Sequence, residues 1–267
     1  MQIPLGFLLG AGIAGLAWRA RSLNGSGAVA ATLTGGLVFG LGGFSWAVLL
    51  LAFFISSSAL SRLFGAKKSF INEKFSKGSR RDWAQVLANG SLGATLAVIS
   101  ALEGNPILAW VAFAGAMAAV TADTWATEIG VLSPSDPRLI TNRQIVERGT
   151  SGAISTTGNL AVIGGALMIG TAAGILSLPA SFLPVLVVTT FGGVCGALFD
   201  SLLGASLQAI YYCPNCLKET ERHPRHTCQT QTEFLRGVAW INNDVVNFAC
   251  SAVGAGVAAS LWLFFFQ

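Results

Sequence analysis

Apolar residues along this chain fall into eight long segments separated by shorter polar stretches. A helix that crosses the hydrocarbon core of a bilayer needs about 20 residues, and most of these segments approach that length. We therefore predict an all-α fold, a polytopic transmembrane bundle of about seven or eight helices with cytoplasmic loops, forming a single integral membrane domain over residues 1–267. The segments are 3–18, 28–42, 44–63, 83–102, 107–129, 151–175, 181–211 and 242–266.

The second segment, 28–42, is short and rich in glycine. Its length leaves two structures open, a full span and a re-entrant element. The first segment, 3–18, has no basic residue before it and no small-residue cleavage site after it, so we interpret it as a retained helix.

The composition of the chain is typical of an integral membrane protein. It is 53% hydrophobic and 10% charged, and its mean hydropathy is +0.64. A soluble domain carries about 25% charged residues. We therefore predict a multi-pass integral membrane protein with membrane lipid around it and no nucleic-acid partner.

The basic residues predict the orientation. All 16 Lys and Arg residues lie in or beside the odd-numbered loops, and the short even-numbered loops carry none. Basic loops stay in the cytoplasm, so this pattern places the odd loops there and both termini outside. The basic residues are Arg19, Arg21, Arg62, Lys67, Lys68, Lys74, Lys77, Arg80, Arg81, Arg138, Arg143, Arg148, Lys218, Arg222, Arg225 and Arg236.

Acidic and hydroxyl residues close one long apolar run. The run 107–120 is followed by TADTWATEIG, residues 121–130. On a helix, Asp123 and Thr127 share one face and Thr124 and Glu128 share the adjacent one. Ionisable groups at membrane depth are costly and mark functional sites, and Mg²⁺ prefers oxygen ligands of this kind.

Other segments place polar groups at the same ends, which predicts a cytoplasm-facing cleft lined by acids and rimmed by basic residues. The predicted catalytic carboxylates are Asp123, Glu128, Asp200 and Asp244, and Mg²⁺ is assigned to Asp123, Asp200 and Asp244. The alternative is that each is a solvated charge at a helix end. For Asp244 that alternative is strong, because Asp is a favourable N-cap.

Phosphate contacts are predicted next to these acids. The stretch 147–152 leads into the sixth segment, and small residues at a helix start expose backbone N–H groups to anions. The stretch 77–83 is a second basic candidate. Ordinary helix capping and a basic membrane anchor are the respective alternatives. The predicted substrate- or phosphate-binding residues are Arg81, Asn89, Arg148, Gly149, Thr150, Ser151, Asn243 and Asn247. No Walker-type GxxxxGK[ST] motif occurs.

The loop 213–236 contains a compact cysteine–histidine cluster. Cys213 and Cys216 have CxxC spacing, and His223, His226 and Cys228 follow. Such spacing suits a tetrahedral Zn²⁺, and a cytoplasmic loop disfavours a disulfide. We predict a structural zinc clip made of Cys213, Cys216, Cys228 and either His226 or His223. Incidental loop thiols are the alternative.

Six motifs of the chain resemble a known membrane family. They are RDWAQVLANG (81–90), TADTWATEIG (121–130), PRLIT (137–141), VERGTSGAIS (146–155), FDSLLGASLQ (199–208) and NNDVVNF (242–248). In this order they resemble the membrane family that contains plant phytyl-phosphate kinase, which is associated with tocopherol synthesis. The resemblance implies transfer of a phosphoryl group from a nucleoside triphosphate, CTP or ATP, to phytyl or another polyprenyl monophosphate.

Two other functions stay open from the sequence. A nucleotidyltransferase acting on a phospholipid would use similar metal-binding carboxylates and release pyrophosphate. An ion or solute transporter would use the buried acids as a relay and show inverted repeats with broken helices. The gathering of polar groups at one side of the membrane counts against the transporter.

Overall fold

The computed structural model describes residues 2–65, 74–78, 80–102, 106–178 and 181–266. These residues form eight helices, and seven of them are long and apolar enough to cross a membrane. The predicted helical membrane bundle is therefore confirmed. The helices are α1 (Ile3–Arg19), α2 (Gly25–Gly42), α3 (Phe44–Phe64), α4 (Trp83–Leu102), α5 (Pro106–Gly130), α6 (Thr156–Ile175), α7 (Phe182–Ser206) and α8 (Asn243–Phe266).

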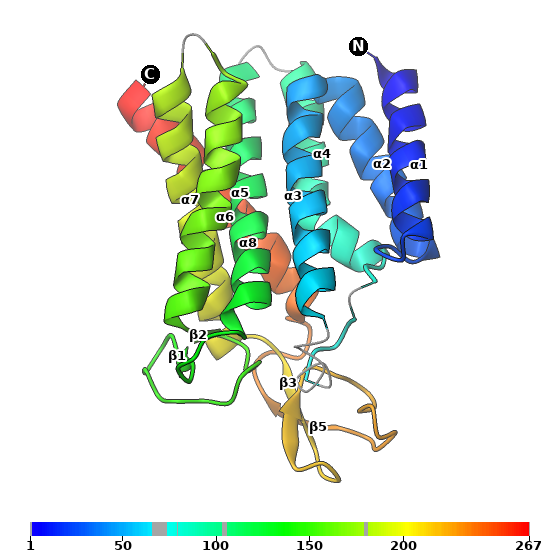
Figure 1. Ribbon diagram of the computed structural model, residues 1–267, viewed down its shortest axis with the longest axis vertical. Helices are drawn as coiled ribbons and strands as arrows, with labels where there is room; N and C mark the ends of the chain where they lie inside the picture. The colour runs from blue at the N-terminus through cyan, green and yellow to red at the C-terminus, as the bar shows by residue number, and fades with distance from the viewer. Residues whose placement is uncertain (1, 66–73, 79, 103–105, 179–180, 267) are drawn as a thin grey trace.

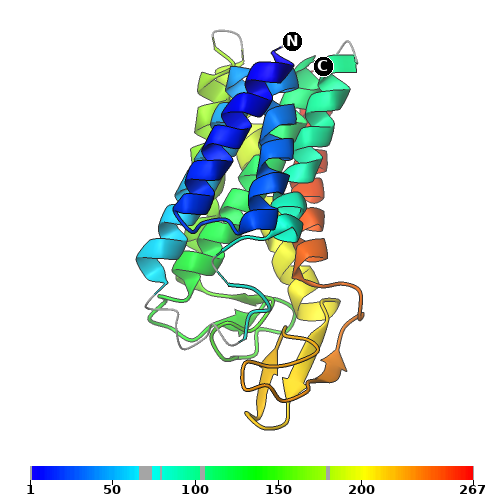
Figure 2. The same ribbon diagram turned by 90° about the vertical axis from the view of Figure 1, so that its right-hand side faces the viewer.

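The helices stand side by side, with both termini at one end of the bundle and the long loops at the other (Figures 1 and 2). This arrangement agrees with an even number of passes. Lys67, Lys68, Ser79 and the predicted outer-loop residues 103–105 and 179–180 lie outside the described residues.

Helix α5 is the centre of the bundle and contacts α3, α4, α6, α7 and α8. Most of its residues from Ala109 to Ala122 are buried alanine, glycine, valine and aromatic side chains. Small residues allow close helix packing in membranes. A Cβ on Gly115 would lie 2.5 Å from the carbonyl oxygen of Gly254 in α8, so the two backbones touch there.

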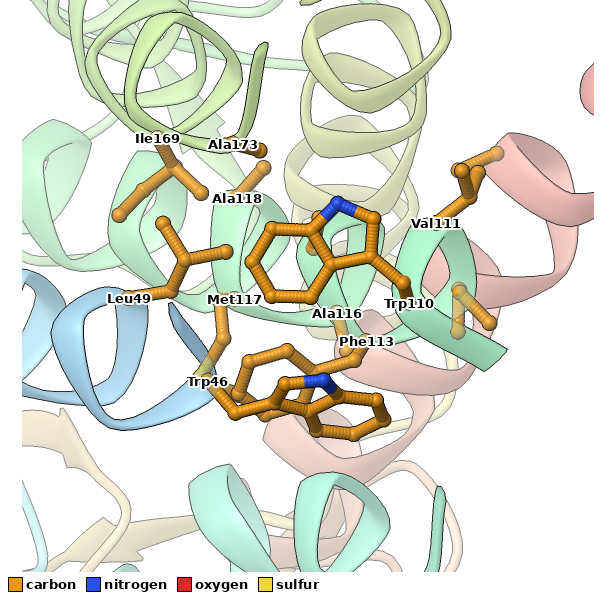
Figure 3. Packing of buried hydrophobic residues seen from close by; sticks show 14 of the residues in the cluster. Trp46, Leu49, Trp110, Val111, Phe113, Ala116, Met117, Ala118, Ile169 and Ala173 are labelled. Atoms are coloured by element: carbon orange, nitrogen blue, oxygen red, sulfur yellow. The ribbon is translucent and has the colours of Figure 1, made fainter. Parts of the chain in front are cut away.

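A cluster of aromatic side chains packs α3 against the first half of α5 (Figure 3). The rings of Trp46 and Phe113 stack with centroids 4.4 Å apart, and Trp110 lies 5.9 Å from Trp46. Leu49, Met117 and Ile169 belong to the same buried cluster. This apolar half of α5 leaves the acidic half at the loop end of the bundle.

The short segment 28–42 forms part of one continuous helix. Helix α2 begins earlier, at Gly25, because the side chain of Asn24 accepts a hydrogen bond from the Gly27 N–H and caps the helix. The full helix has 18 residues and is one of the seven candidate spans, whereas α1 is shorter at 17 residues. The structure therefore favours a span over a re-entrant element.

Two predicted segments are longer than the helices they contain. Helix α6 begins at Thr156, where Ser155 accepts a hydrogen bond from the Gly158 N–H, and not at residue 151. Helix α7 ends at Ser206, and the predicted segment continues beyond it through a turn into the strand that begins at Ile210. Apolar runs therefore continued into extended backbone, which hydropathy alone does not distinguish from helix.

The loops contain two small antiparallel sheets that the sequence did not predict. Strands β1 (Arg138–Leu139) and β2 (Ala153–Ile154) form the first. The second has the order β4-β3-β5, made of β3 (Ile210–Cys213), β4 (Lys218–Thr220) and β5 (Glu233–Arg236). This second sheet spans most of the loop predicted to carry the zinc clip.

We predict that the sheet-bearing end of the bundle faces the cytoplasm, because the basic residues cluster there. A cysteine at exposed Leu178, after α6, is expected to react with an impermeant maleimide added to intact cells. A cysteine at exposed Ser135, after α5, is expected to react only after the membrane is permeabilised. The unmodified chain provides the background labelling of its own cysteines, and the reverse pattern would contradict the predicted orientation.

Candidate functional site

A cavity of about 610 Å³ lies at the loop end of the bundle. The residues of α3 to α8 at this end and the loops beside them form its walls. Eleven of the twelve residues predicted for catalysis or phosphate binding line it, although they come from five separate stretches of the chain. They are Arg81, Asn89, Asp123, Glu128, Arg148, Gly149, Thr150, Ser151, Asp200, Asn243 and Asn247.

Asp123 of α5 and Asp200 of α7 form the acidic centre of the cavity. Their carboxyl groups lie within hydrogen-bonding reach of each other. The Oδ2 atom of Asp200 is buried and has no hydrogen-bond partner within the described part of the chain. Two carboxylates this close repel each other unless a proton or a cation lies between them. Their oxygen-only donor set fits a hard divalent cation such as Mg²⁺.

Glu221 is a third acid of this centre, and the sequence analysis missed it. It follows β4 and lies close enough to Asp200 for their charges to interact. Ser151 and Gln208 donate hydrogen bonds to its Oε1 at 2.8 and 2.9 Å, and the Ser76 N–H donates to Oε2 at 3.3 Å. Burial raises the pKa of Glu221 above its usual range. Its surroundings in sequence, Lys218 to His223, resemble an ordinary solvated loop, so no sequence signal pointed to it.

Glu128 lies on a different side of α5 from the Asp123–Asp200 pair. It is buried, and its Oε1 accepts a hydrogen bond of 2.8 Å from Ser61 of α3. The negative charge of Glu128 also interacts with the guanidinium of Arg81. These contacts make Glu128 a partner of the basic wall of the cavity.

Arg81 is held in place by contacts of both its side chain and its backbone. Its guanidinium lies 5.2 Å from the ring centre of Phe53 and 5.6 Å from that of Phe54. Its backbone N–H donates to Ser22 and its carbonyl accepts from Asn24, so the α1–α2 connection fixes it. Burial lowers the pKa of Arg81 to about 10, and the Glu128 charge opposes this shift, so the side chain stays protonated at neutral pH.

Arg148, Arg222 and Lys77 also line the cavity. Arg148 is oriented by a hydrogen bond of 3.2 Å to the Val131 carbonyl. Arg222 follows Glu221 directly in the chain, and like Glu221 it was not predicted from the sequence. Forked guanidinium groups bind phosphate oxygens well. The cavity therefore places positive and negative side chains around one space, which is the arrangement that a metal–phosphate complex requires.

Asp244 is the predicted acid that the structure does not place in this cavity. It forms an ion pair with Lys77, which also lies 3.1 Å from Asp82. Among the described residues, its neighbours Asn243 and Asn247 line the cavity instead. Asp244 is not the helix cap either, because the Asn242 side chain accepts the capping hydrogen bond from Val245. The position of Asp244 on α8 turns its carboxylate toward Lys77.

The stretch 149–152 reaches the cavity as a turn and not as a helix start. Strand β2 lies between it and α6. Gly149 and Gly152 have φ angles of 81° and 78°, which favour glycine. A Cβ on Gly152 would lie 2.2 Å from the Ala205 backbone nitrogen, so this turn touches α7 directly. The prediction that residues 147–152 lead directly into a helix is therefore wrong, although residues 149–152 do line the cavity.

A second, apolar cavity of about 240 Å³ lies between α1, α2, α3 and α4. Leucine, phenylalanine, alanine, valine and isoleucine residues make up most of its wall. Arg81, Gln85 and Asn89 line both this cavity and the polar one. The two spaces therefore meet at these three residues, with Arg81 at the junction between an apolar and a charged environment.

The predicted thiol and imidazole ligands also come together, outside the cavity. Ligand atoms of Cys213, Cys216, His226 and Cys228 all lie within 4.8 Å of one another, an arrangement able to bind a metal ion. His223 stacks on Tyr211 with ring centroids 4.4 Å apart. His226, and not His223, is therefore the histidine of this cluster.

Fold and site together define a multi-pass helical membrane protein whose polar cavity holds acids at the loop ends of its helices. The chain belongs to the integral membrane protein family DUF92, whose profile it matches over residues 8–255. This membership confirms the membrane family that the six motifs resemble.

The curated relatives cover most of the chain. It is 31% identical to Protein PGR of Arabidopsis thaliana over 258 residues, which is 88% of each chain. It is 35% identical to an uncharacterized membrane protein of Methanocaldococcus jannaschii over 70% of this chain and 75% of the relative. Identity to the chloroplastic Protein VTE6 of Arabidopsis thaliana is 26%, over 92% of this chain and 67% of the relative. No solved structure matches.

Proposed function

We propose that this protein is an isoprenoid-lipid phosphate kinase, which transfers a phosphoryl group from CTP or ATP to phytyl or another polyprenyl monophosphate. The observation that carries the proposal is the junction of the two cavities at Arg81. An acid- and base-lined space suits the nucleotide and the phosphates, and an adjoining apolar space suits a lipid tail. Membership of the family that the motifs resemble supports the same activity.

We assign Mg²⁺ to Asp123, Asp200 and Glu221. Mg²⁺ bound by these carboxylates would neutralise charge on the nucleotide phosphates. The buried Oδ2 of Asp200 offers an oxygen with no other partner among the described residues, which supports this assignment. Asp244 takes a different role here, because its ion pair with Lys77 orients that ammonium at the cavity wall.

The basic residues divide between the two substrates. Arg81, at the junction, binds the lipid monophosphate, and Arg148, Arg222 and Lys77 bind the nucleotide phosphates. Phosphoryl transfer depends mainly on positioning and charge stabilisation. An oxygen of the lipid phosphate attacks the γ-phosphorus. The new P–O bond forms as the bond to the β,γ-bridging oxygen breaks, and the nucleoside diphosphate leaves with that electron pair.

The acceptor is already ionised, so the reaction needs no strong general base. Both histidines of the chain, His223 and His226, lie in the loop 213–236, and neither is among the residues that line the polar cavity. The isoprenoid tail occupies the apolar cavity between α1 and α4, where it is shielded from water and lies at membrane depth.

The test incubates purified full-length protein with phytyl phosphate, Mg²⁺ and CTP or ATP labelled in either the α- or the γ-phosphate. Label from the γ-phosphate is expected in phytyl diphosphate, together with an equal amount of nucleoside diphosphate. Transfer of α-label to lipid with release of pyrophosphate would support the nucleotidyltransferase instead. Absence of any labelled lipid with either nucleotide would overturn the proposed activity.

A further inference from the structure

Two pairs of ligand atoms in the cysteine–histidine cluster have about the spacing of a tetrahedral metal site, and all four ligand atoms lie within 4.8 Å of one another. The Sγ atoms of Cys213 and Cys228 are 3.5 Å apart, and Nδ1 of His226 is 3.4 Å from Cys228 Sγ. A tetrahedral zinc with metal–sulfur bonds of about 2.3 Å separates neighbouring ligand atoms by roughly 3.5–3.8 Å. All four ligand residues come from one loop, and none of the three cysteines is in a disulfide.

Two tight turns present these ligands. The first lies between β3 and β4, where the Leu217 N–H donates to the Cys213 carbonyl at 2.9 Å and Leu217 has a φ of 53°. The second is closed by a hydrogen bond of 2.9 Å from the Gln229 N–H to the His226 carbonyl. Left-handed backbone at a bulky residue is costly and persists where the surroundings fix it. Both turns have this feature, since Gln229 has a φ of 67°.

The chemistry of the donor set favours zinc. Three thiols and one imidazole form a common structural zinc set, and soft thiolates select against Mg²⁺ and Ca²⁺. His226 is 2% exposed, and Nδ1 is its ring nitrogen beside the cluster, 3.4 Å from Cys228 Sγ. Burying a polar ring is unfavourable, and a metal bond at Nδ1 offsets part of that cost.

The segment between the ligands reaches the acidic cavity. Glu221 lies midway between Cys216 and His226 in the chain, directly after strand β4. β4 pairs with β3 in a register that starts at Cys213 and Lys218 and ends at Tyr211 and Thr220. A metal at the cluster therefore anchors both ends of the segment that carries Glu221.

We propose that Cys213, Cys216, His226 and Cys228 bind a structural Zn²⁺, and that this ion fixes Glu221 against Asp200 in the cavity. The zinc site itself is independent of the reaction that the cavity performs. The positioning of Glu221 as a ligand of the catalytic metal rests on the proposed function. Zinc thereby supports the formation of the divalent-cation site without touching a substrate.

Metal analysis of the purified full-length protein tests the zinc site. One zinc per chain is expected in the wild type, and Cys213→Ser and Cys228→Ser are each expected to lower that content to well below half. Cys195→Ser is the matched control, because Cys195 lies in α7 outside the cluster, and it is expected to keep its zinc. A monodisperse wild-type protein without zinc, or cluster variants that keep it, would overturn the proposal.

Binding of Mn²⁺ at the cavity, measured by electron paramagnetic resonance, tests the link to Glu221 without any activity assay. Loss of a supporting residue around a metal typically weakens binding by about 10–100-fold. We expect a weakening of about 10-fold in Cys228→Ser and a similar one in Glu221→Gln, which keeps its zinc. Unchanged Mn²⁺ binding in zinc-free Cys228→Ser would overturn the positioning role. Normal Mn²⁺ and zinc binding without kinase activity would instead contradict the proposed function alone.

Discussion

Asp123→Asn is expected to reduce kinase turnover by at least about 100-fold while the protein remains folded in detergent, as expected when a preorganised electrostatic group is lost at a reacting centre. Asparagine has nearly the same shape, so the packing of α5 against α7 and α8 survives. It keeps one oxygen but has no charge, and the binding of Mg²⁺ to phosphates depends on carboxylate charge. The measurement is the rate of phytyl diphosphate formation at saturating nucleotide, with size-exclusion chromatography as the test of folding.

Asp200→Asn is expected to behave in the same way, because both acids face each other across the same space. Groups that act as one unit have non-additive effects, so the double variant is expected to be scarcely slower than either single variant. Asp136→Asn is the matched control, since Asp136 is exposed in the loop after α5. Near-normal turnover by monodisperse Asp123→Asn protein would contradict the assignment of the metal site.

The sequence was most informative where a physical cost made the pattern unambiguous. Carboxylates at the end of a long apolar run, as at Asp123 and Asp200, are costly in a membrane, which is why the sequence predicts a functional site there. The basic loops and the polar helix ends were predicted to lie at the same end of the bundle, and the structure gathers most of the predicted residues there. The CxxC spacing and the following His226 and Cys228 similarly predicted a cluster that the structure assembles.

The sequence was least informative where the outcome depends on three-dimensional register. Glu221 enters the cavity only because β4 pairs with β3, and neither short strand has a sequence signal that distinguishes it from a loop. Asp244 and Asn247 both lie at the start of α8, and the rotation of that helix decides that Asp244 meets Lys77. The apolar cavity was not predicted either, because it arises where four helices fail to fill the space between them.

Gly35→Leu is expected to impair the use of long isoprenoid phosphates much more than short ones. Gly35 of α2 lines the apolar cavity, and a Cβ there would meet only the Gly10 Cα, at 3.9 Å. The substitution therefore fits the fold, and the rest of the leucine side chain occupies space assigned to the lipid tail. Displacing two or three buried methylene groups costs about 2 kcal/mol, or roughly 30-fold in kcat/KM for phytyl phosphate.

A five-carbon isoprenyl monophosphate, whose tail ends nearer to Arg81, is expected to lose less than about threefold in the same variant, since it buries far fewer methylene groups in the apolar cavity. Gly12→Leu in α1 is the matched control, because nothing lies within 4 Å of a Cβ at Gly12 and that position is exposed. It is expected to retain the wild-type ratio of kcat/KM between the long and the short acceptor. An unchanged ratio in Gly35→Leu, or an equal change in Gly12→Leu, would place the tail elsewhere, and Arg81 would then no longer mark the boundary between the phosphate and the tail of the acceptor.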